Sequence, residues 1–531
     1  MPRANTTHLI DELDELKNQF APAAAGRLLQ LLNTLSRKPL KDTDSLFRYH
    51  EILLFLRAYP QNAALVRATE SELRKIANRV SRLGEQGIDL TPLQHPEVSG
   101  IAGSSVVDTF SFYIVRWLLQ RHATEIEIEW DWVEDENRLA QAWPRFIPLL
   151  EEDTLVEANI PYREWLRAAR DGRSELRWLV EQVDQLAKPE AERAAIYDSQ
   201  KIYVRWTPRY KATRTGMRVA RSSFFYHRGQ LIQRREIDLY QELARPAPPL
   251  QKLSPKQGVA ALDLAREAST IRYRELYGFT HGDPKHVYHA ELGRGVELFL
   301  MGLPAEKRLP LRACHALTIF KNGVPIGYFE GLSLFERMES GFNLYYTFRE
   351  GETAWLYAKI LNVMHHFTGV TAFSLDPYQI GHENEEGISS GAFWFYRKLG
   401  FRPMRKAMLE LALKEEQKIA TRKGYRTRPA TLRKLAESPM IFQLRENRDW
   451  DRFQMRKVGL RAQRGIRQTA QGASGLELIL PLIPDFKSWG DEEKKRLGQI
   501  IKAKNGREEV TYLKLMQKHE RLRNALIKMG S

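Results

Sequence analysis

The feature that most constrains the fold is the order of local signals between Ala313 and Leu413. His315–Phe320 and Pro325–Glu330 are two β-rich runs, and Lys321–Val324 joins them through the dipeptide Asn322-Gly323. Asn-Gly between apolar runs is a strong hairpin signal, because both residues accept the positive φ of a type I′ turn. The sequence therefore predicts an antiparallel hairpin at this point.

A third β-rich run and an amphipathic helix follow the hairpin. Phe342–Phe348 is the predicted strand, and it leads directly through Arg349–Thr353 into the helix. The apolar side chains of that helix recur at helical spacing along one face, at Leu356, Ile360, Val363 and Phe367. Gly369 ends the helix, and Val370–Leu375 is predicted as the next strand.

The strand-turn-helix junction around Gly351 has a chemical use. The first turn of a helix leaves backbone N–H groups unpaired, and these groups together with the helix dipole form an anion site. A glycine at the junction lets a pyrophosphate approach the backbone. A plain tight turn is the alternative reading of Gly351.

The last predicted helix, Ser390–Leu399, closes on Gly400-Phe401 and carries the most specific motif of the chain. Its residues fit Ala-x-x-x-Tyr-x-Lys-x-Gly-Phe, at Ala392, Tyr396, Lys398, Gly400 and Phe401. This motif and the element order before it resemble the GNAT (GCN5-related N-acetyltransferase) superfamily. The resemblance covers about residues 255–415 and says nothing about the rest of the chain.

The resemblance implies an acyl-CoA co-substrate and a set of residues that bind it. In the family, main-chain amides of the turn bind the coenzyme A pyrophosphate, and the preceding strand pairs with the pantetheine arm. Here the implied cofactor-binding residues are Tyr346, Phe348, Arg349, Glu350, Gly351, Glu352, Thr353, Asn384 and Ser389. The chain departs from the family turn at Phe348, where Gln or Arg is usual, and at Thr353, where a small residue is usual.

The implied reaction is direct transfer of an acyl group from acyl-CoA to an amine, with no covalent enzyme intermediate. Tyr396 inherits the role of the acid that protonates the leaving thiolate, although packing in its aromatic segment also accounts for it. Deprotonation of the amine requires a base. Glu330 is the candidate base, while Glu336 and Glu352 lie near the same region, and Glu352 also suits a helix N-terminus.

Length and composition set the remaining expectations for the domains. A chain of 531 residues exceeds what one core usually serves. We expect an α+β protein with a mainly helical domain over residues 1–200, a β-rich connector and Pro-rich linker over 201–250, a GNAT-like mixed sheet with flanking helices over 251–415, and a basic, mainly helical region over 416–531. Within these parts Glu125–Trp132, Lys201–Trp206, Ser222–His227 and Gln230–Ile237 are predicted as strands, the last two joined by a turn at Arg228-Gly229.

The net charge of +16 is confined to the C-terminal quarter. From Arg397 onward there are 33 Lys and Arg against 15 Asp and Glu, whereas the first 396 residues hold 49 against 51. The basic residues are densest at Arg422–Pro429. They are compatible with RNA or another polyanion as a partner, while a solvated surface is the favoured interpretation. This basicity keeps two further hypotheses open: an aminoacyl-tRNA-dependent GNAT-like transferase, and a catalytically silent scaffold that binds RNA or protein.

Cysteine usage and hydropathy complete the expectations. The one cysteine, Cys314, excludes an internal disulfide framework and a Cys-rich zinc site, and no metal is expected. No run of about 18 uncharged apolar residues occurs, so no membrane span is predicted. A cytoplasmic location is the expectation. The sequence does not indicate the amine acceptor or the oligomeric state.

Overall fold

The computed structural model describes residues 5–135, 137–142, 145–146, 162–466 and 475–531. The chain forms two compact units, each built from two stretches of sequence. Unit 1 consists of residues 1–229 and 263–280, and unit 2 of residues 230–262 and 281–531. The domain borders predicted near residues 200, 250 and 415 stay predictions.

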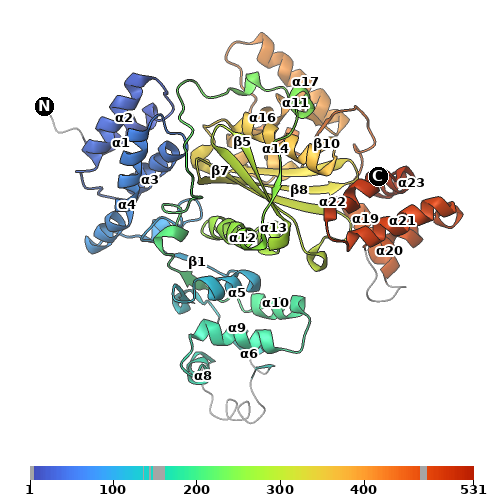
Figure 1. The fold of residues 1–531 in the computed structure, drawn as a ribbon, viewed down its shortest axis with the longest axis horizontal. Helices are drawn as coiled ribbons and strands as arrows, with labels where there is room; N and C mark the ends of the chain where they lie inside the picture. The colour runs from blue at the N-terminus through green and yellow to red at the C-terminus, as the bar shows by residue number, and fades with distance from the viewer. Residues whose placement is uncertain (1–4, 136, 143–144, 147–161, 467–474) are drawn as a thin grey trace. The chain divides into compact units, whose positions relative to one another are not determined.

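Helices predominate in unit 1, as the sequence predicts for the first 200 residues (Figure 1). Its helices are α1 (Thr6–Leu16), α2 (Pro22–Leu35), α3 (Thr43–Ala58), α4 (Ala63–Glu85), α5 (Phe112–Arg121), α6 (Asn137–Ala142), α8 (Tyr162–Ala169), α9 (Glu175–Gln185), α10 (Glu190–Ser199) and α13 (Tyr277–Thr280). Asp42 and Asn62 begin α3 and α4 as N-caps, because their side chains accept backbone N–H groups three residues on. The first half of α12 (Pro255–Thr270) belongs to unit 2 and the second half to unit 1.

A small antiparallel sheet lies within unit 1, in the order β1 (Val106–Asp108), β3 (Val204–Trp206), β2 (Ile126–Ile128). The strand predicted over Glu125–Trp132 is confirmed only at its centre. A 3₁₀ turn begins at Trp130, because the indole Nε1 donates to Glu175 and the buried ring turns into the core. Glutamates alternate with apolar residues along this segment, and Glu129 among them is buried beside Arg205.

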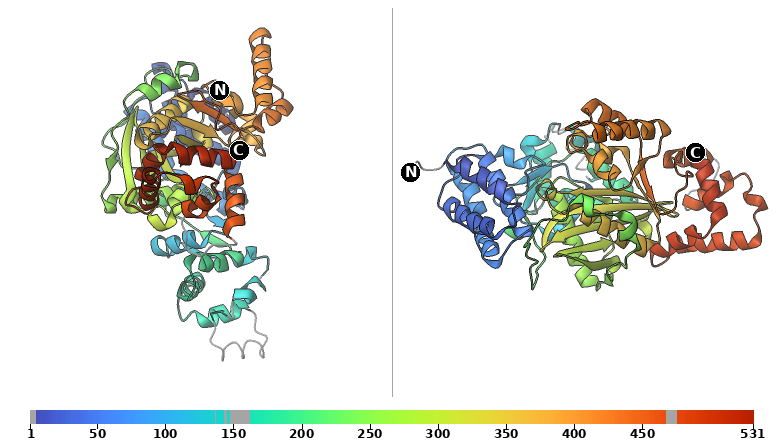
Figure 2. Two further views of the ribbon diagram at one scale, coloured as in Figure 1. Left: turned by 90° about the vertical axis from the view of Figure 1, so that its right-hand side faces the viewer. Right: turned by 90° about the horizontal axis from the view of Figure 1, so that it is seen from above.

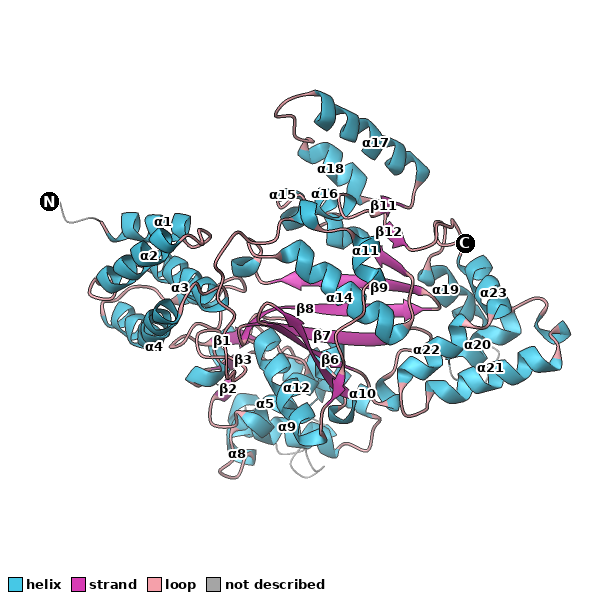
Figure 3. Ribbon diagram, turned by 45° about the horizontal axis from the view of Figure 1, so that its top comes forward, coloured by secondary structure: helices cyan, strands magenta, loops and turns pink. Residues whose placement is uncertain are grey.

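Unit 2 is built on a nine-stranded mixed sheet (Figures 1 and 3). Its spatial order is β11-β12-β10-β9-β8-β7-β6-β5-β4. The strands are β4 (Gln251–Lys252), β5 (Val287–Gly293), β6 (Val296–Met301), β7 (Ala313–Lys321), β8 (Val324–Leu334), β9 (Arg337–Leu344), β10 (Ala372–Leu375), β11 (Arg402–Pro403) and β12 (Met440–Gln443). The coarse prediction of an α+β protein with a mixed sheet and helical regions is therefore confirmed.

The predicted β7–β8 hairpin is present. Lys321 pairs with Val324, and Asn322 and Gly323 between them have φ values of 48° and 80°. Both central residues of the turn thus adopt the positive φ that a type I′ turn requires. The predicted helix is α14 (Thr353–Thr368), which ends on Gly369 in the left-handed conformation. Its Tyr357 contacts Phe342 of β9, so α14 covers one face of the sheet.

The third predicted strand, Phe342–Phe348, is wrong in its second half. The strand β9 starts at Arg337 and stops at Leu344, and Tyr346–Phe348 form the 3₁₀ turn η8. The last bond to β8 runs from Tyr345 N to Ile326 O over 2.9 Å. Because β8 begins at Val324, directly after the hairpin turn, it offers almost no backbone with which Tyr346–Phe348 could pair.

The hairpin predicted over residues 222–237 is also wrong. Neither Ser222–His227 nor Gln230–Ile237 forms a strand, and η5 (Arg234–Glu236) is the regular element of this stretch. Their β-forming side chains find no neighbouring strand, and β propensity without a pairing partner does not make a sheet. The strand predicted over Lys201–Trp206 is confirmed in its second half, at β3.

The remaining helices of unit 2 follow β10 or precede the sheet. They are α11 (Leu239–Ala244), α15 (Glu385–Ser389), α16 (Ala392–Arg397), α17 (Lys406–Thr421), α18 (Pro429–Ala436), α19 (Met455–Ile466), α20 (Gly475–Ile479), α21 (Asp491–Lys504), α22 (Glu509–Gln517) and α23 (Glu520–Gly530). Helix α17 projects from the sheet, as Figure 2 shows, and has only Ala412 and Glu415 buried. Within the described ranges, no helix is long and apolar enough to cross a membrane.

Candidate active site

The two parallel strands β9 and β10 pair over three residues, which lie at the beginning of β9 and cover most of β10. Their register runs from Arg337 opposite Ala372 to Glu339 opposite Ser374, and it ends there. Strand β9 continues to Leu344, while the chain after β10 turns away into η9 (Pro377–Ile380). The inner edge of β9 beyond Glu339 therefore has no strand paired beside it, and this unpaired stretch is called the opening below.

Backbone polar groups of β9 point into this opening. In an antiparallel pair, alternate residues turn their N–H and C=O toward the partner strand. Tyr345 donates to β8, so Phe342 and Leu344 direct their groups away from β8 and toward the opening. Two side chains use the carbonyls: Gln379 Nε2 donates to Phe342 O over 2.8 Å, and Arg349 Nε to Leu344 O over 3.1 Å.

Tyr396 of α16 reaches the same opening. Its phenol oxygen accepts a second bond from Gln379 Nε2 over 3.1 Å, while its ring packs edge-on against Tyr357 and Phe401. Burial raises the pKa of the Tyr396 phenol well above its usual value, although the Gln379 bond and the charge of Arg349 act in the opposite direction. The phenol therefore keeps its proton at neutral pH, and it acts only as an acceptor toward Gln379.

The N-terminus of α14 closes one end of the opening. The first intrahelical bond runs from Leu356 N to Glu352 O, so the N–H groups of Thr353, Ala354 and Trp355 have no intrahelical acceptor. Gly351 N already donates to Phe348 O over 3.1 Å. The N–H groups of this junction that lack an intrahelical acceptor are therefore those of the first helical residues, and Gly351 belongs to the turn before them.

Glu352 lies beneath this helix start and is only 3% exposed. Its carboxylate accepts two bonds from Arg294, one of them 3.0 Å long from Nε to Oε2, and a third from the N–H of Ile232 over 3.1 Å. Lys321 Nζ lies 3.4 Å from Oε2 and donates to Arg294 O over 2.7 Å. Glu352, Arg294 and Lys321 form an ion cluster, buried except at the partly exposed Arg294, that fixes the α14 start to two hairpin turns.

The cluster carries a net positive charge at neutral pH. Burial disfavours the Glu352 carboxylate, but the Arg294 bonds and the Lys321 charge outweigh it and hold the pKa of Glu352 below its usual value. Burial lowers the pKa of Lys321 to about 8, against the attraction of Glu352. At neutral pH two cations thus face one carboxylate, which favours an anion at the adjacent helix N-terminus.

The other predicted turn residues take different positions. Tyr346 is 76% exposed, and Phe348 is buried below the turn, where its side chain reaches no solvent. Arg349 pairs with Glu386 of α15 and lies with its guanidinium 6.0 Å from the Tyr346 ring. Glu350 is exposed. Thr353 caps the turn locally, because its Oγ1 donates to Arg349 O over 2.9 Å.

Asn384, Ser389 and Glu330 are the last of the predicted residues. Asn384 is the N-cap of α15, accepting Gly387 N–H and donating to Tyr378 O over 3.0 Å, and Ser389 ends the same helix on the surface. Glu330 lies opposite Gly341 on β8 and β9. It faces the side of the sheet away from α14, since odd-numbered β9 residues alternate with Ser340, whose Oγ contacts Tyr357 Oη of α14. The structure therefore does not bring Glu330 to the Tyr396 side.

Three residues of the site were missed by sequence reasoning: Arg294, Lys321 and Gln379. Arg294 forms the tip of the β5–β6 turn between Gly293 and Gly295, and all three have positive φ. An arginine held between two glycines was a usable signal for a placed side chain. Nothing in the sequence around Lys321 or Gln379 marks them.

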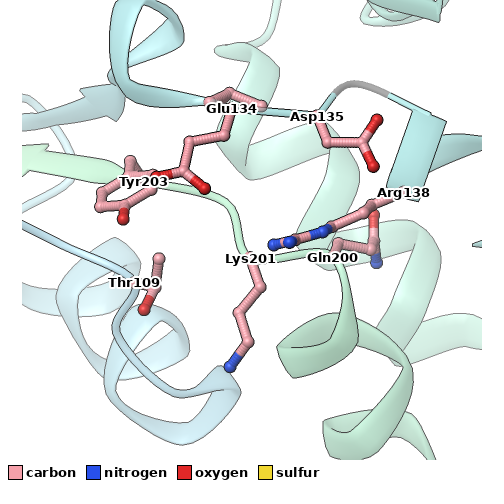
Figure 4. Close-up of a pocket in the computed structure, with 8 residues that line it drawn as sticks. Thr109, Glu134, Asp135, Arg138, Gln200, Lys201 and Tyr203 are labelled. Carbon is pink, nitrogen blue, oxygen red and sulfur yellow. The ribbon is translucent and has the colours of Figure 1, made fainter.

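Unit 1 contains a separate cavity of about 240 Å³ (Figure 4). Carboxylates of Glu134 and Asp135 and the cationic groups of Arg138 and Lys201 line it together. None of the sequence-predicted residues lies there, and its opposite charges balance. No cluster of three or more His, Cys, Asp or Glu suited to a metal ion occurs among the residues whose placement is described.

Comparison with known proteins adds no assignment to this geometry. No protein-family model matches the chain, and neither a curated protein nor a solved structure does. The functional argument therefore rests on the residues of the site.

Proposed function

We propose that unit 2 is an acyl-CoA-dependent N-acyltransferase of the GNAT type. The observation that carries the proposal is the opening after Glu339, where β9 and β10 part and a helix N-terminus and a buried tyrosine meet. An acyl-CoA needs an anion site for its pyrophosphate, a strand edge for its pantetheine amides and a polar group at its thioester. The three features lie along one opening, which supports this ligand above other anions.

In the proposed mechanism the chain contributes binding, orientation and one proton. N–H groups of Thr353, Ala354 and Trp355 bind the pyrophosphate, and the inner edge of β9 at Phe342 and Leu344 pairs with the pantetheine arm. The amine attacks the thioester carbonyl, and the carbon–sulfur bond breaks. Tyr396 donates its proton to the departing thiolate, and its raised pKa keeps the phenol protonated at neutral pH until the thiolate forms.

A charge change at Thr353 tests the anion site. Thr353→Asp places a carboxylate at the first residue of α14, where it suits the helix dipole but repels a pyrophosphate. We expect acetyl-CoA affinity, measured by calorimetry, to fall at least about tenfold, or 1.4 kcal/mol. The nearly isosteric Thr353→Asn is the control, since it loses the same hydroxyl and adds no charge. Equal affinities of the two variants would contradict a pyrophosphate site at this helix.

A second candidate function is supported by the hairpin of α17 and α18. Eight of its cations are exposed, and no ion pair or hydrogen bond engages their side chains in the described part of the chain: Arg405, Lys406, Lys414, Arg422, Lys423, Arg426, Arg428 and Lys434. Helix α18 contacts α15, α16 and η9, the elements that carry Asn384, Tyr396 and Gln379. RNA bound to this basic hairpin would lie beside the opening, as an aminoacyl-tRNA-dependent transferase requires.

Salt dependence of tRNA binding tests this candidate. The variant with Arg422, Lys423, Arg426 and Arg428 changed to Gln should show a log Kd–log salt slope about 3 smaller than the unchanged chain, by counterion release. The control changes four exposed lysines near α21, Lys487, Lys494, Lys495 and Lys502, and removes the same charge. Equal slopes in both variants would show only diffuse attraction. Tight tRNA binding without acetyl-CoA binding would favour the second function over the first.

A further inference from the structure

A cavity of about 300 Å³ opens on the face of the unit 2 sheet opposite α14. Arg337 and Glu339 of β9 line it, and they alternate with Ser340, whose hydroxyl contacts Tyr357 of α14. Residues after β12, among them Trp450 and Phe453, close the cavity. The C-terminal quarter of the chain thus contributes a wall to a cavity in the sheet.

The cavity lies at the point where β9 and β10 part. Glu339 is the last β9 residue that pairs with β10, and Leu375 and Asp376, at and just after the end of β10, line the same cavity. Three residues beyond Asp376, Gln379 bonds Phe342 O and the Tyr396 phenol on the other side. A ligand in the cavity would approach the proposed thioester position from the other face of the sheet, through the gap where β9 and β10 no longer pair.

The charged side chains of the cavity are only loosely paired. Arg312 Nη1 lies 3.5 Å from Glu339 Oε1, and Arg337 Nη2 lies 3.7 Å from Glu339 Oε2. Both separations exceed a hydrogen bond. Asp376 is exposed beside them and caps η9. These groups can rearrange onto a ligand without breaking a short bond between themselves.

Arg337 is held in place by a hydrogen bond of its Nε and by two aromatic rings beside its guanidinium. Its Nε donates to Ser374 Oγ over 2.9 Å, and its guanidinium lies 5.1 Å from the Trp450 ring and 5.7 Å from the Phe453 ring. Its Nη1 is buried and has no hydrogen-bond partner among the described residues. A guanidinium with an unmet donor is a recognition group for a carboxylate.

We propose that this cavity is the acceptor subsite and that it takes a free amino acid. The carboxylate binds Arg312 and Arg337, the ammonium binds Glu339 and Asp376, and the apolar walls cover the side chain. This inference rests on the proposed acyl transfer. The volume holds one small ligand and is at the lower end of protein pockets.

The proton balance of the transfer is complete with these groups. The ammonium loses one proton to Glu339, directly or through water, and its nitrogen attacks the thioester carbon. The new carbon–nitrogen bond forms as the carbon–sulfur bond breaks, and the nitrogen loses its second proton to solvent. The thiolate takes the Tyr396 proton, and the phenol and Glu339 then exchange protons with water. One proton leaves per amide formed at neutral pH.

Binding to the full chain without acyl-CoA tests the subsite. Each of the twenty L-amino acids is titrated to 10 mM by calorimetry, and the tightest is compared with its analogue lacking the carboxylate and its analogue lacking the amine. We expect at least one amino acid to bind, and both analogues to bind at least tenfold more weakly. No binding in the panel, or equal binding of the analogues, would overturn the proposal.

Single substitutions assign the two ends of the ligand. Arg312→Gln should abolish the preference for the amino acid over the analogue that lacks the carboxylate. Glu339→Gln should abolish the preference over the analogue that lacks the amine. Glu306→Gln, on the surface, should change neither preference. If acetyl-CoA binds but no amino acid does, the subsite is wrong and the acyltransferase proposal stands. If an amino acid binds with the expected preferences but acetyl-CoA does not, the subsite stands and acyl transfer is contradicted.

Discussion

Replacing Glu352 with glutamine should lower the free energy of unfolding of unit 2 by about 3 to 5 kcal/mol. The change leaves the fully buried Lys321 and the partly exposed Arg294 without their counter-charge, and the desolvation of Lys321 is then uncompensated. The glutamine would retain the bond from Ile232 but not the charge. Urea unfolding followed by circular dichroism measures the effect, with Glu350→Gln, two residues earlier and exposed, as the matched control.

A second substitution separates charge from packing. Adding Lys321→Met to Glu352→Gln removes one unpaired buried cation, so part of the lost stability should return, at least about 1 kcal/mol.

The dependence of the free energy of unfolding on pH below neutral gives a further check. Because the pKa of Glu352 is lowered, its stabilisation is present above pH 4.5 and is lost as pH falls through the lower, folded-state value. A Glu352→Gln protein with unchanged stability would mean that the cluster does not hold the helix start.

Replacing Tyr396 with phenylalanine should lower kcat by about 10²-fold and leave KM within threefold. Only the phenol is lost, and the ring contacts with Tyr357 and Phe401 remain. Gln379 keeps its bond to Phe342 O, so stability should fall by no more than about 1 kcal/mol. Thiol release from acetyl-CoA is the assay, with the amino acids that bind the cavity as acceptors.

A control substitution and the pH dependence of activity accompany this measurement. Tyr378→Phe, on the exposed tyrosine of η9, removes a hydroxyl at the surface and should leave kcat unchanged. Since the pKa of Tyr396 is raised above that of a free phenol, the activity of the unchanged enzyme should show no loss assigned to this residue up to about pH 10. A kcat for Tyr396→Phe within twofold of the unchanged enzyme would rule out the phenol as the acid.

The parts of the fold that could be predicted from the sequence are those determined by residues close together in the chain. Asn322-Gly323 determines a turn by its own φ preferences, and Gly369 ends α14 for the same reason. The apolar period of α14 indicated a helix wherever its partner lay. By contrast, β9 ends at Leu344 because little of β8 remains beyond Gly327, the residue opposite it, and Ser222–Ile237 forms no sheet because no strand adjoins it. Strand limits depend on a neighbour, which one segment does not reveal.

The candidate site was less predictable, because its groups come together over long sequence distances. Arg294 and Lys321 precede Glu352 by 58 and 31 residues, and they meet it only after three hairpins form. The motif around Tyr396 identified a tyrosine but not Gln379, which orients it. The alternation along β8 directs Glu330 to the face of the sheet away from Tyr396, which is the face on which the proposed acceptor cavity opens. The cavity joins β8, β9 and β10 to residues near 450, which no local pattern could indicate.

Amide hydrogen exchange tests the central claim most directly, that acyl-CoA binds in the opening between β9 and β10. The N–H groups of Phe342 and Leu344 face this opening without a strand partner, and those of Thr353–Trp355 start α14. With saturating acetyl-CoA, exchange in peptides covering residues 340–356 should slow at least about tenfold, while β5 and β6 stay unchanged. Binding of acetyl-CoA with no added protection in residues 340–356 would contradict the account.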